Sequence, residues 1–308
     1  YTGNGSTQTI SSVGFQPDFT WIKHRDGETA HMLFDYVRGA LKRIQSNTNN
    51  SETTANNTLT SWNSDGFALG TENDTNGSGR LFASWNWKAN GSGSSNTDGS
   101  TTSTVSVNTT SGFSIVKYTG TSSAATIGHG LGAVPKMIIV KNLSSGSRKW
   151  VVWHHNLTSA SKYLSLSSNA TEANDTATWN NTLPTSTVFS SAGSGEVNQG
   201  GQNFIAYCFA DVQGYQKMGG YTGNNTAGGS NTQFVYTGFR PKLVMVKEIS
   251  GTSNWVIYDL NRNYSLTENN YNIRAARLAW NSDNAESSFT DDHGIDILSN
   301  GFNIRDNS

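Results

Sequence analysis

The side chains best suited to chemistry begin with three lysines that each end a short apolar segment. Lys23, Lys141 and Lys247 follow "FTWI", "MIIV" and "LVMV", and Asp35 and Asp259 lie about a dozen positions after the first and the third. A lysine in this place has two structural interpretations, a solvated strand end or a buried ion pair with the aspartate, and one functional interpretation, contact with a ligand. We expect the structural role.

Two acidic segments contain carboxylates of the kind that calcium prefers. "DDHGID" (291–296) holds three aspartates and a histidine, and "TENDTNGSGR" (71–80) holds Glu72 and Asp74. The first lacks the fixed ligand spacing of a calcium loop, and the second is a glycine-rich loop. The sequence therefore predicts polar surface turns here, with no metal and no cofactor.

The sequence does not predict catalysis. It contains no G-x-S-x-G nucleophile elbow. No strand carries the row of acids from which the carboxylate pair of a glycosidase is drawn. His154 and His155 are adjacent, and neighbouring strand residues point to opposite faces of a sheet. We therefore predict that the protein is not an enzyme.

Sugar binding is a better candidate than catalysis, because exposed tryptophans beside amide or carboxylate side chains form sugar contacts. The candidate ligand-binding residues are Trp62 with Asn63 and Asp65, and Trp280 with Asn281 and Asp283. The competing interpretation is that both tryptophans belong to the hydrophobic core.

These residues lie within a unit that occurs three times. "GFQPDFTWIK" (14–23), "GAVPKMIIVK" (132–141) and "GFRPKLVMVK" (238–247) align without gaps, at offsets of 118 and 224 residues from the first. A tripeptide Tyr-Thr-Gly precedes each of these segments, at Tyr1, Tyr118 and Tyr221, and the tripeptide occurs once more at Tyr236. Ordered motifs with matched spacing predict three copies of one domain-sized unit.

The pattern within each unit is that of strands. The apolar segments are short, rich in β-branched and aromatic residues, and bounded by proline and polar loops. Only 35–45 and 272–280 have the pattern of short helices. The predicted fold class is all-β, with three tandem antiparallel β-sandwiches of the jelly-roll type.

The predicted domains are sandwich repeat 1 at 1–90, a flexible Gly/Ser/Thr-rich linker at 91–111, repeat 2 at 112–213 and repeat 3 at 214–308. Repeat 1 lacks the strand that leads into Tyr-Thr-Gly, and repeat 3 lacks the aromatic closing strand. We expect further chain, or a neighbouring subunit, to supply these two strands.

Composition argues against several partners. The formal net charge is −1 and basic residues are not clustered, which argues against binding to nucleic acid. No apolar run approaches the ~20 residues that span a bilayer. Cys208 is the single cysteine and lies in an apolar run, so we predict a small buried side chain without a disulfide.

The motifs "YTGNGS", "GFQPDFTWIK", "WNSDGFALG" and "FASWNWKA", and their counterparts in repeat 3, resemble a repeated concanavalin A-like β-sandwich module. That module occurs in structural proteins of marine bacteriophages, in predicted tail fibres and other virion appendages. Repeat 2 departs most, with "GLGAVP" and "WHHN" where the other copies have "GFQPD" or "GFRPK" and an aspartate.

The resemblance implies a virion structural protein that works outside the cell, as a fibre or appendage that attaches to a host-surface glycan. The implied partners are further copies of the chain, as a homo-oligomer, and other virion proteins. Strung modules suit a long, thin object, and 46% of the residues are Gly, Ser, Thr or Asn, which give polar, neutral surfaces. The alternatives are a capsid decoration or other purely structural protein and, less favoured, a secreted carbohydrate-binding module.

Overall fold

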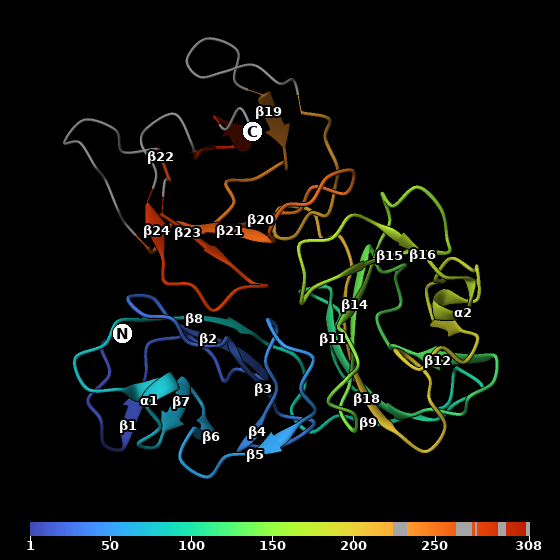
Figure 1. Ribbon diagram of the computed structural model, residues 1–308, viewed down its shortest axis with the longest axis horizontal. Helices are drawn as coiled ribbons and strands as arrows, with labels where there is room; N and C mark the ends of the chain where they lie inside the picture. Colours follow the sequence, from blue (N-terminus) through green and yellow to red (C-terminus); the bar gives the residue numbers. More distant parts are fainter. Residues whose placement is uncertain (224–232, 263–272, 275, 289–293, 306–308) are drawn as a thin grey trace.

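Antiparallel sheets make up almost all the regular structure in the computed structural model of the chain (Figure 1). The structure describes residues 1–223, 233–262, 273–274, 276–288 and 294–305. Among these residues the helices are two single turns, α1 (Asn73–Asn76) and α2 (Thr176–Trp179). The predicted all-β class is therefore confirmed.

The strands that the repeats have in common follow the same order in each repeat. In repeat 1 (1–90) they are β1 (Gln8–Ile10), β2 (Phe19–His24), β3 (Met32–Asp35), β4 (Lys42–Arg43), β5 (Thr53–Thr54), β6 (Leu59–Asn63), β7 (Gly66–Leu69) and β8 (Phe82–Trp87). In repeat 2 (112–213) they are β11 (Phe113–Thr119), β12 (Ala125–Gly128), β13 (Met137–Asn142), β14 (Val151–His154), β15 (Lys162–Ser165), β16 (Ala173–Asn174), β17 (Val188–Ser191) and β18 (Asn203–Phe209). In repeat 3 (214–308) they are β19 (Gln233–Tyr236), β20 (Leu243–Val246), β21 (Val256–Asp259), β22 (Ile273–Arg274), β23 (Ala276–Ala279), β24 (Ser287–Ser288), β25 (Ile295–Leu298) and β26 (Gly301–Ile304).

The register of the strands repeats as well as their order. The strand that leads to the motif lysine pairs with the next strand through Phe19↔Asp35, Met137↔His154 and Leu243↔Asp259. The second sheet of each repeat is built on Ile10↔Phe67, Ile127↔Phe189 and Val235↔Phe302. Equivalent residues therefore occupy equivalent places, and the three-copy interpretation of the sequence agrees with the pairing.

The segment 91–111 is not the flexible linker that its composition predicts. It forms β9 (Ser94–Asn96) and β10 (Ser103–Asn108), and β10 pairs with β11 along its whole length. Val105 is buried and Val107 packs beside it on the core of repeat 2, so the strand has one apolar face. Two valines in alternation thus give a Ser/Thr-rich strand one apolar face to pack on the core.

The two predicted helices are also wrong. Between residues 35 and 45 the chain turns, with Gly39 at φ 92° and Leu41 at φ 68°, and right-handed helices exclude positive φ. Residues 272–280 contain β22 and β23, where Ala276, Leu278 and Trp280 are buried in alternation. A period of two is the period of a strand.

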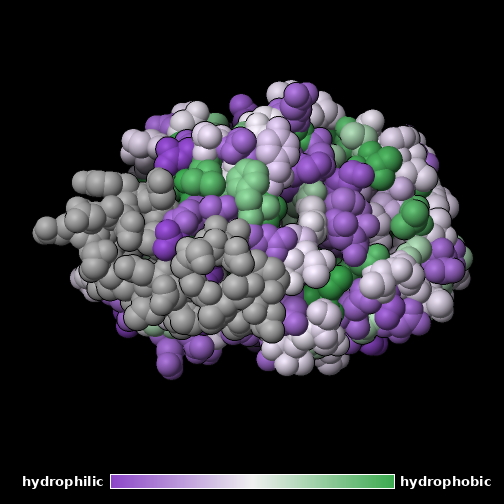
Figure 2. Space-filling model, turned by 90° about the horizontal axis from the view of Figure 1, so that it is seen from above, coloured by the Kyte–Doolittle hydropathy of each residue, from purple (hydrophilic) through white to green (hydrophobic). Residues whose placement is uncertain are grey.

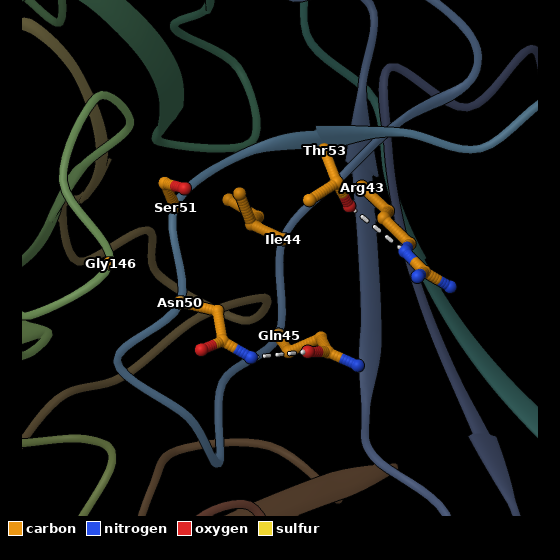
Figure 3. Close-up of a pocket in the computed structure, with 7 residues that line it drawn as sticks. All are labelled: Arg43, Ile44, Gln45, Asn50, Ser51, Thr53 and Gly146. Carbon is orange, nitrogen blue, oxygen red and sulfur yellow. Dashed lines mark hydrogen bonds between the residues drawn. The ribbon is translucent and has the colours of Figure 1, made fainter.

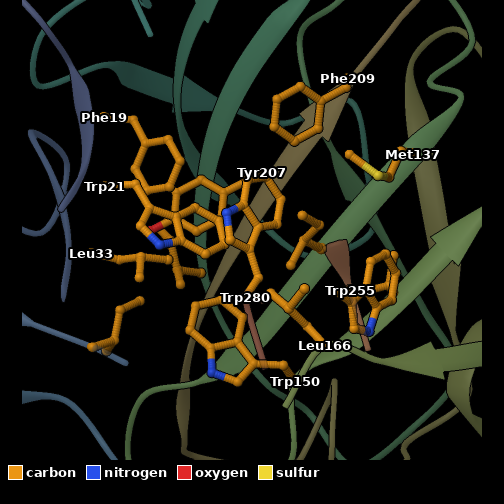
Figure 4. Close-up of a cluster of buried hydrophobic side chains, with 14 of the residues drawn as sticks. Phe19, Trp21, Leu33, Met137, Trp150, Leu166, Tyr207, Phe209, Trp255 and Trp280 are labelled. Atoms are coloured by element: carbon orange, nitrogen blue, oxygen red, sulfur yellow. The ribbon is translucent and has the colours of Figure 1, made fainter. Parts of the chain in front are cut away.

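Each repeat has a hydrophobic core of its own, and all three repeats share a fourth. The separate cores include Phe67 in repeat 1, Phe189 in repeat 2 and Phe302 in repeat 3. The shared core gathers buried side chains from every repeat, including Trp21, Tyr207 and Trp255 (Figure 4). The three repeats accordingly pack around one centre and are not strung in series (Figure 1).

The face of the molecule that is seen from above in Figure 2 is predominantly polar where it is coloured. The face seen from above is mostly purple and white, with green side chains scattered in small groups (Figure 2). Within the described part of the chain, no helix is long and apolar enough to cross a membrane.

Candidate functional site

The junctions between repeats contain buried polar groups that recur at equivalent positions. A histidine or tryptophan side chain lies immediately before each of the strands β3, β14 and β21. Its ring nitrogen donates a hydrogen bond to a backbone carbonyl of another repeat. These contacts are His31 Nε2 to Ala279 O (3.1 Å), Trp150 Nε1 to Gln45 O (2.8 Å) and Trp255 Nε1 to Ser165 O (2.9 Å). Repeat 1 donates its hydrogen bond to repeat 3, repeat 2 donates to repeat 1, and repeat 3 donates to repeat 2. The three contacts therefore form a closed cycle around the molecule.

The tautomer of His31 follows from its neighbours. Trp21 Nε1 lies 2.9 Å from His31 Nδ1, and an indole nitrogen can only donate, so Nδ1 accepts. The proton therefore sits on Nε2, which donates to Ala279. Burial lowers the pKa of His31 well below its usual value, which keeps the ring neutral.

The three motif lysines make a second cycle of contacts between repeats, again from repeat 1 to 3, from 2 to 1 and from 3 to 2. Each ammonium group donates to a carbonyl of its own repeat and to one carbonyl of a neighbour. The contacts between repeats are Lys23 Nζ to Asp283 O (3.2 Å), Lys141 Nζ to Asn49 O (2.9 Å) and Lys247 Nζ to Asn169 O (3.3 Å). The ion pairs with Asp35 and Asp259 that the sequence suggested are not present, because the register places these carboxylates opposite Phe19 and Leu243, four residues before each lysine. The carboxylates pair with arginines instead.

Burial changes the protonation of these lysines. Lys23 and Lys141 are fully buried, and burial lowers the pKa of each to about 8. Burial also lowers the pKa of Lys247, which is half-buried. The carbonyl dipoles around each group offset part of the desolvation cost of the charge.

Asp35 and Asp259 each receive a third kind of contact between repeats. Tyr207 of repeat 2 donates its hydroxyl to Asp35 Oδ2 at 2.7 Å, and Trp85 of repeat 1 donates Nε1 to Asp259 Oδ2 at 3.1 Å. Tyr207 and Trp85 hold the same position in β18 and β8. Burial raises the pKa of Tyr207 well above its usual value, so the hydroxyl remains a donor.

Each of these aspartates also belongs to a group of three charged side chains, an aspartate, an arginine and a glutamate. In repeat 1, Arg38 Nε pairs with Asp35 at 2.5 Å and Arg38 Nη1 lies 3.2 Å from Glu52. In repeat 3, Arg262 pairs in the same way with Asp259 (2.5 Å) and Glu286 (2.7 Å). We did not predict this group, although the sequence carries a signal for it, since Asp-x-x-Arg occurs at both 35–38 and 259–262.

Repeat 2 replaces the ionic group with apolar and neutral side chains. His154 stands where the register places Asp35 and Asp259, and Leu157 stands in the shared core where the arginines would be. Burial, aided by the neighbouring His155, lowers the pKa of His154 to about 4, so this ring is neutral. Glu172 turns instead to Lys162, at 3.5 Å.

The predicted ligand-binding residues do not form one site. Trp280 is buried in the shared core and stacks on Trp21 with centroids 4.0 Å apart, so it is not an exposed sugar platform. Asn281 accepts a hydrogen bond from the Trp255 backbone, and Asp283 offers its carbonyl to Lys23. Trp280 and Asp283 offer their carbonyls to Ser46 and Lys23 of repeat 1, whereas Asn281 contacts residues of its own repeat.

Trp62, Asn63 and Asp65 lie apart from these, at the β6–β7 hairpin. Trp62 is half-buried and packs on Tyr36 with centroids 5.1 Å apart. Asp65 is exposed, and its carboxylate accepts from the backbone of Ser12 and Gly14. Of the two predicted tryptophan groups, this one has its ring partly at the surface.

The sequence also singled out Cys208 and the segments 71–80 and 291–296. Cys208 is buried and free, as predicted. In "TENDTNGSGR", residues 73–76 form α1. Residues 291–293 of "DDHGID" lie outside the described residues, while Asp296 pairs with Arg305 at 2.7 Å. Across the described ranges, no three His, Cys, Asp or Glu side chains are grouped to hold a metal ion.

A small surface pocket lies between repeats 1 and 2. Its volume is about 270 Å³, and it is lined by Arg43, Ile44, Gln45, Asn50, Ser51, Thr53 and Gly146 (Figure 3). Arg43 Nε already donates to Thr53 Oγ1 at 3.0 Å, and Asn50 reaches Gln45 at 3.4 Å. Amides, hydroxyls and a guanidinium can bind a small polar group, but the volume is below the ~300–1,000 Å³ of ordinary ligand sites.

The fold and the junctions define an all-β protein of three repeats whose buried polar side chains hold the repeats to one another. The chain belongs to the family described as Domain of unknown function (DUF7483), which matches residues 1–308. No curated protein and no solved structure matched the chain.

Trp150→Phe isolates one contact of the first cycle, because it keeps an aromatic side chain and removes the donor to Gln45. We expect the free energy of unfolding to fall by about 1–3 kcal/mol, the usual cost of a buried acceptor left unpaired. Urea denaturation measures it. Trp62→Phe is the control, since its donor reaches the Thr20 hydroxyl at a half-buried site. An equal loss in both variants would contradict the role of the junction.

Lys23 and Lys141 should titrate near pH 8, whereas exposed lysines titrate near ~10.4. NMR of chains labelled with ¹³C at lysine Cε can follow each group, and Lys23→Met and Lys141→Met assign the two signals. Titration of both groups together with the surface lysines would show that the ammonium groups are not desolvated.

These lowered pKa values have a consequence for stability. A lysine with a folded-state pKa below its unfolded-state pKa loses its proton first in the folded chain, so the free energy of unfolding rises above pH 8. The thiol of Cys208 has the opposite effect above pH 9, because burial raises its pKa from 9.0 to about 12. We therefore expect the wild type to gain stability between about pH 7.5 and 9, and Lys141→Met to gain less.

Arg38→Leu should destabilise repeat 1 by about 3–5 kcal/mol, because it leaves the buried carboxylate of Asp35 without its counter-ion. The double variant Asp35→His/Arg38→Leu reproduces the His154–Leu157 pair of repeat 2, and it should recover part of that loss. Unfolding followed by tryptophan fluorescence compares the two. A double variant no more stable than Arg38→Leu would show that the charge is not the cause.

Proposed function

We propose that this protein is a non-enzymatic structural component of a bacteriophage virion, a fibre or appendage that contributes to attachment to the host surface. The observation that supports a structural role is the repeated set of contacts between repeats. The functional alternative for the three motif lysines was contact with a ligand. All three donate instead to backbone carbonyls of a neighbouring repeat, namely Lys23, Lys141 and Lys247. The ammonium groups of these lysines therefore help to hold the repeats rigidly against one another.

The virion setting is supported by sequence. The motifs that place the buried strands, "GFQPDFTWIK" and "GFRPKLVMVK" among them, are those that resemble the repeated module of phage structural proteins. We infer that each repeat is a concanavalin A-like antiparallel sandwich of the jelly-roll type. A neutral surface rich in Gly, Ser, Thr and Asn suits a protein that is exposed outside the cell, alongside further copies and other virion proteins.

Attachment would use the surface tryptophan. Trp62 lies beside Asn63 and Asp65 at a hairpin, and a partly exposed ring next to polar side chains is a sugar-binding arrangement. One such contact is weak, but oligomeric display of weak sites raises avidity by about 10²–10⁴-fold.

A capsid decoration protein is the second candidate, and the arrangement of the repeats favours it. Three repeats around a shared core make a short, thick block, which suits a surface cover better than the long series of modules that a fibre suggests. Both candidates need the rigidity that the junctions provide.

Immunogold electron microscopy of virions with antibody against this chain separates the two. We expect gold at the tail or at projecting filaments. Gold spread over the capsid facets would establish the second candidate instead, and virions without gold would exclude both. A glycan array with the wild type and Trp62→Ala tests attachment, with Trp62→Phe as the variant that retains a ring.

A further inference from the structure

The three junctions between repeats share one backbone contact. At each junction the amide of a glutamate donates a hydrogen bond to the carbonyl that lies two residues after the motif lysine of another repeat. These contacts are Glu286 N to Arg25 O (2.6 Å), Glu52 N to Leu143 O (2.9 Å) and Glu172 N to Ile249 O (3.0 Å). The junctions therefore have a common frame, in which their side chains can be compared position by position.

The junction between repeats 1 and 3 carries ionic or titratable side chains where the other two carry apolar or neutral ones. Leu143 belongs to the shared core and Ile249 packs against it, whereas Arg25 pairs with Glu286 at 2.6 Å. The ring donor of this junction is His31, while the other two junctions use tryptophans, which do not titrate. Repeats 1 and 3 are also the pair that the chain does not connect directly, since repeat 2 lies between them in the sequence.

Protonation of His31 is incompatible with its contacts. Nδ1 accepts from Trp21 Nε1 at 2.9 Å and Nε2 donates to Ala279 O at 3.1 Å, so the neutral ring satisfies both partners. A protonated imidazole has only donors, and two N–H groups would then face each other at Nδ1. The ring is fully buried, so the charge would also lack water. The protonated ring is accommodated once the junction opens and water reaches it.

The surroundings of His31 oppose a second proton on balance. The charged groups that act on the ring are Lys23 of β2 and Arg262, which follows β21, and both cations disfavour protonation. From β23 and the segment after it, the backbone of Ala279 and Ser282 favours the charged form. Burial outweighs these two contacts and keeps the pKa of the ring well below its usual value.

Arginines hold the carboxylates of this junction. Glu286 pairs with Arg25 and with Arg262, and Asp259 also pairs with Arg262. Ordinary carboxyl groups titrate near pH ~4, whereas a histidine in water titrates near ~6.5. The range between about pH 7 and 5 therefore separates a response of histidine from a response of carboxyl groups.

The other buried histidines do not make the contact that His31 makes. His24, His129 and His154 bond within their own repeats, so their protonation would break no contact between repeats. His155 donates to the carbonyl of Met218, and a protonated ring keeps that donor.

We propose that the junction between repeats 1 and 3 is an acid-sensitive closure, which opens on protonation of His31 while the other two junctions stay closed. The open form binds one proton more than the closed form below pH ~6.5, so the equilibrium constant for opening rises by about tenfold for each further pH unit. Opening separates Trp21 from Trp280, whose rings stack with centroids 4.0 Å apart across the junction, and uncovers part of the shared core (Figure 4). The inference follows from the junctions alone and does not depend on a virion role.

Native-state hydrogen exchange followed by NMR tests the closure on the 308-residue chain. The amides of Glu286, Glu52 and Glu172 report on the three junctions from equivalent positions. Each rate is divided by the intrinsic exchange rate at the same pH. We expect the corrected rate of Glu286 to rise by about tenfold between pH 6 and 5. At pH 5 it should exceed the corrected rates of Glu52 and Glu172 by at least about tenfold, since those junctions stay closed.

His31→Gln should abolish that rise, because an amide can accept from Trp21 and donate to Ala279 but does not titrate. His129→Gln is the matched control, since it removes a buried histidine that bonds within repeat 2, and it should leave the rise at Glu286 intact.

Three results would overturn the proposal. One corrected rate common to all three amides would mean that the molecule opens as a unit. A corrected rate at Glu286 that does not change between pH 6 and 5 would show that the junction does not respond to acid. A rise that persists in His31→Gln would assign the response to another group. The first two comparisons use the wild type alone, so they hold whether or not the variants fold.

Discussion

The central sheets of this protein are buried on both faces, and the rest of the structure depends on that constraint. One face of β2 and of β13 packs on a core within its own repeat, and the other packs on the core that all three repeats share. A sheet that is buried on both faces leaves little space for water molecules beside its side chains. Polar groups on the shared side need partners, because unpaired buried groups are costly, and many of them find these partners in a neighbouring repeat.

The polar contacts at the junctions are the consequence. The lysine ammonium groups, the ring donors before β3, β14 and β21, and the donors of β8 and β18 all reach across to the next repeat. A purely apolar interface would allow the repeats to slide, whereas directional contacts define one arrangement. Their common direction around the centre makes the three junctions variants of one interface.

Repeat 2 shows which part of that interface tolerates change. It keeps the motif lysine and the ring donor, Lys141 and Trp150, but exchanges the aspartate–arginine pair for His154 and Leu157. Replacement of a buried ionic group by neutral and apolar side chains is often close to neutral in free energy, provided that both charges go together. The loss of Asp and Arg in the same repeat fits that rule.

The sequence by itself determined the class, the three copies and the strands that carry the motifs, because alternation and fixed spacing are local properties of the chain. It also indicated that Cys208 is buried. Only the tertiary structure decided that Trp280 is core, that 91–111 joins a sheet and that the lysines bind carbonyls of a neighbour. Each of these depends on which surface packs against a residue from another repeat, and contacts across a hundred residues leave no periodicity in the sequence.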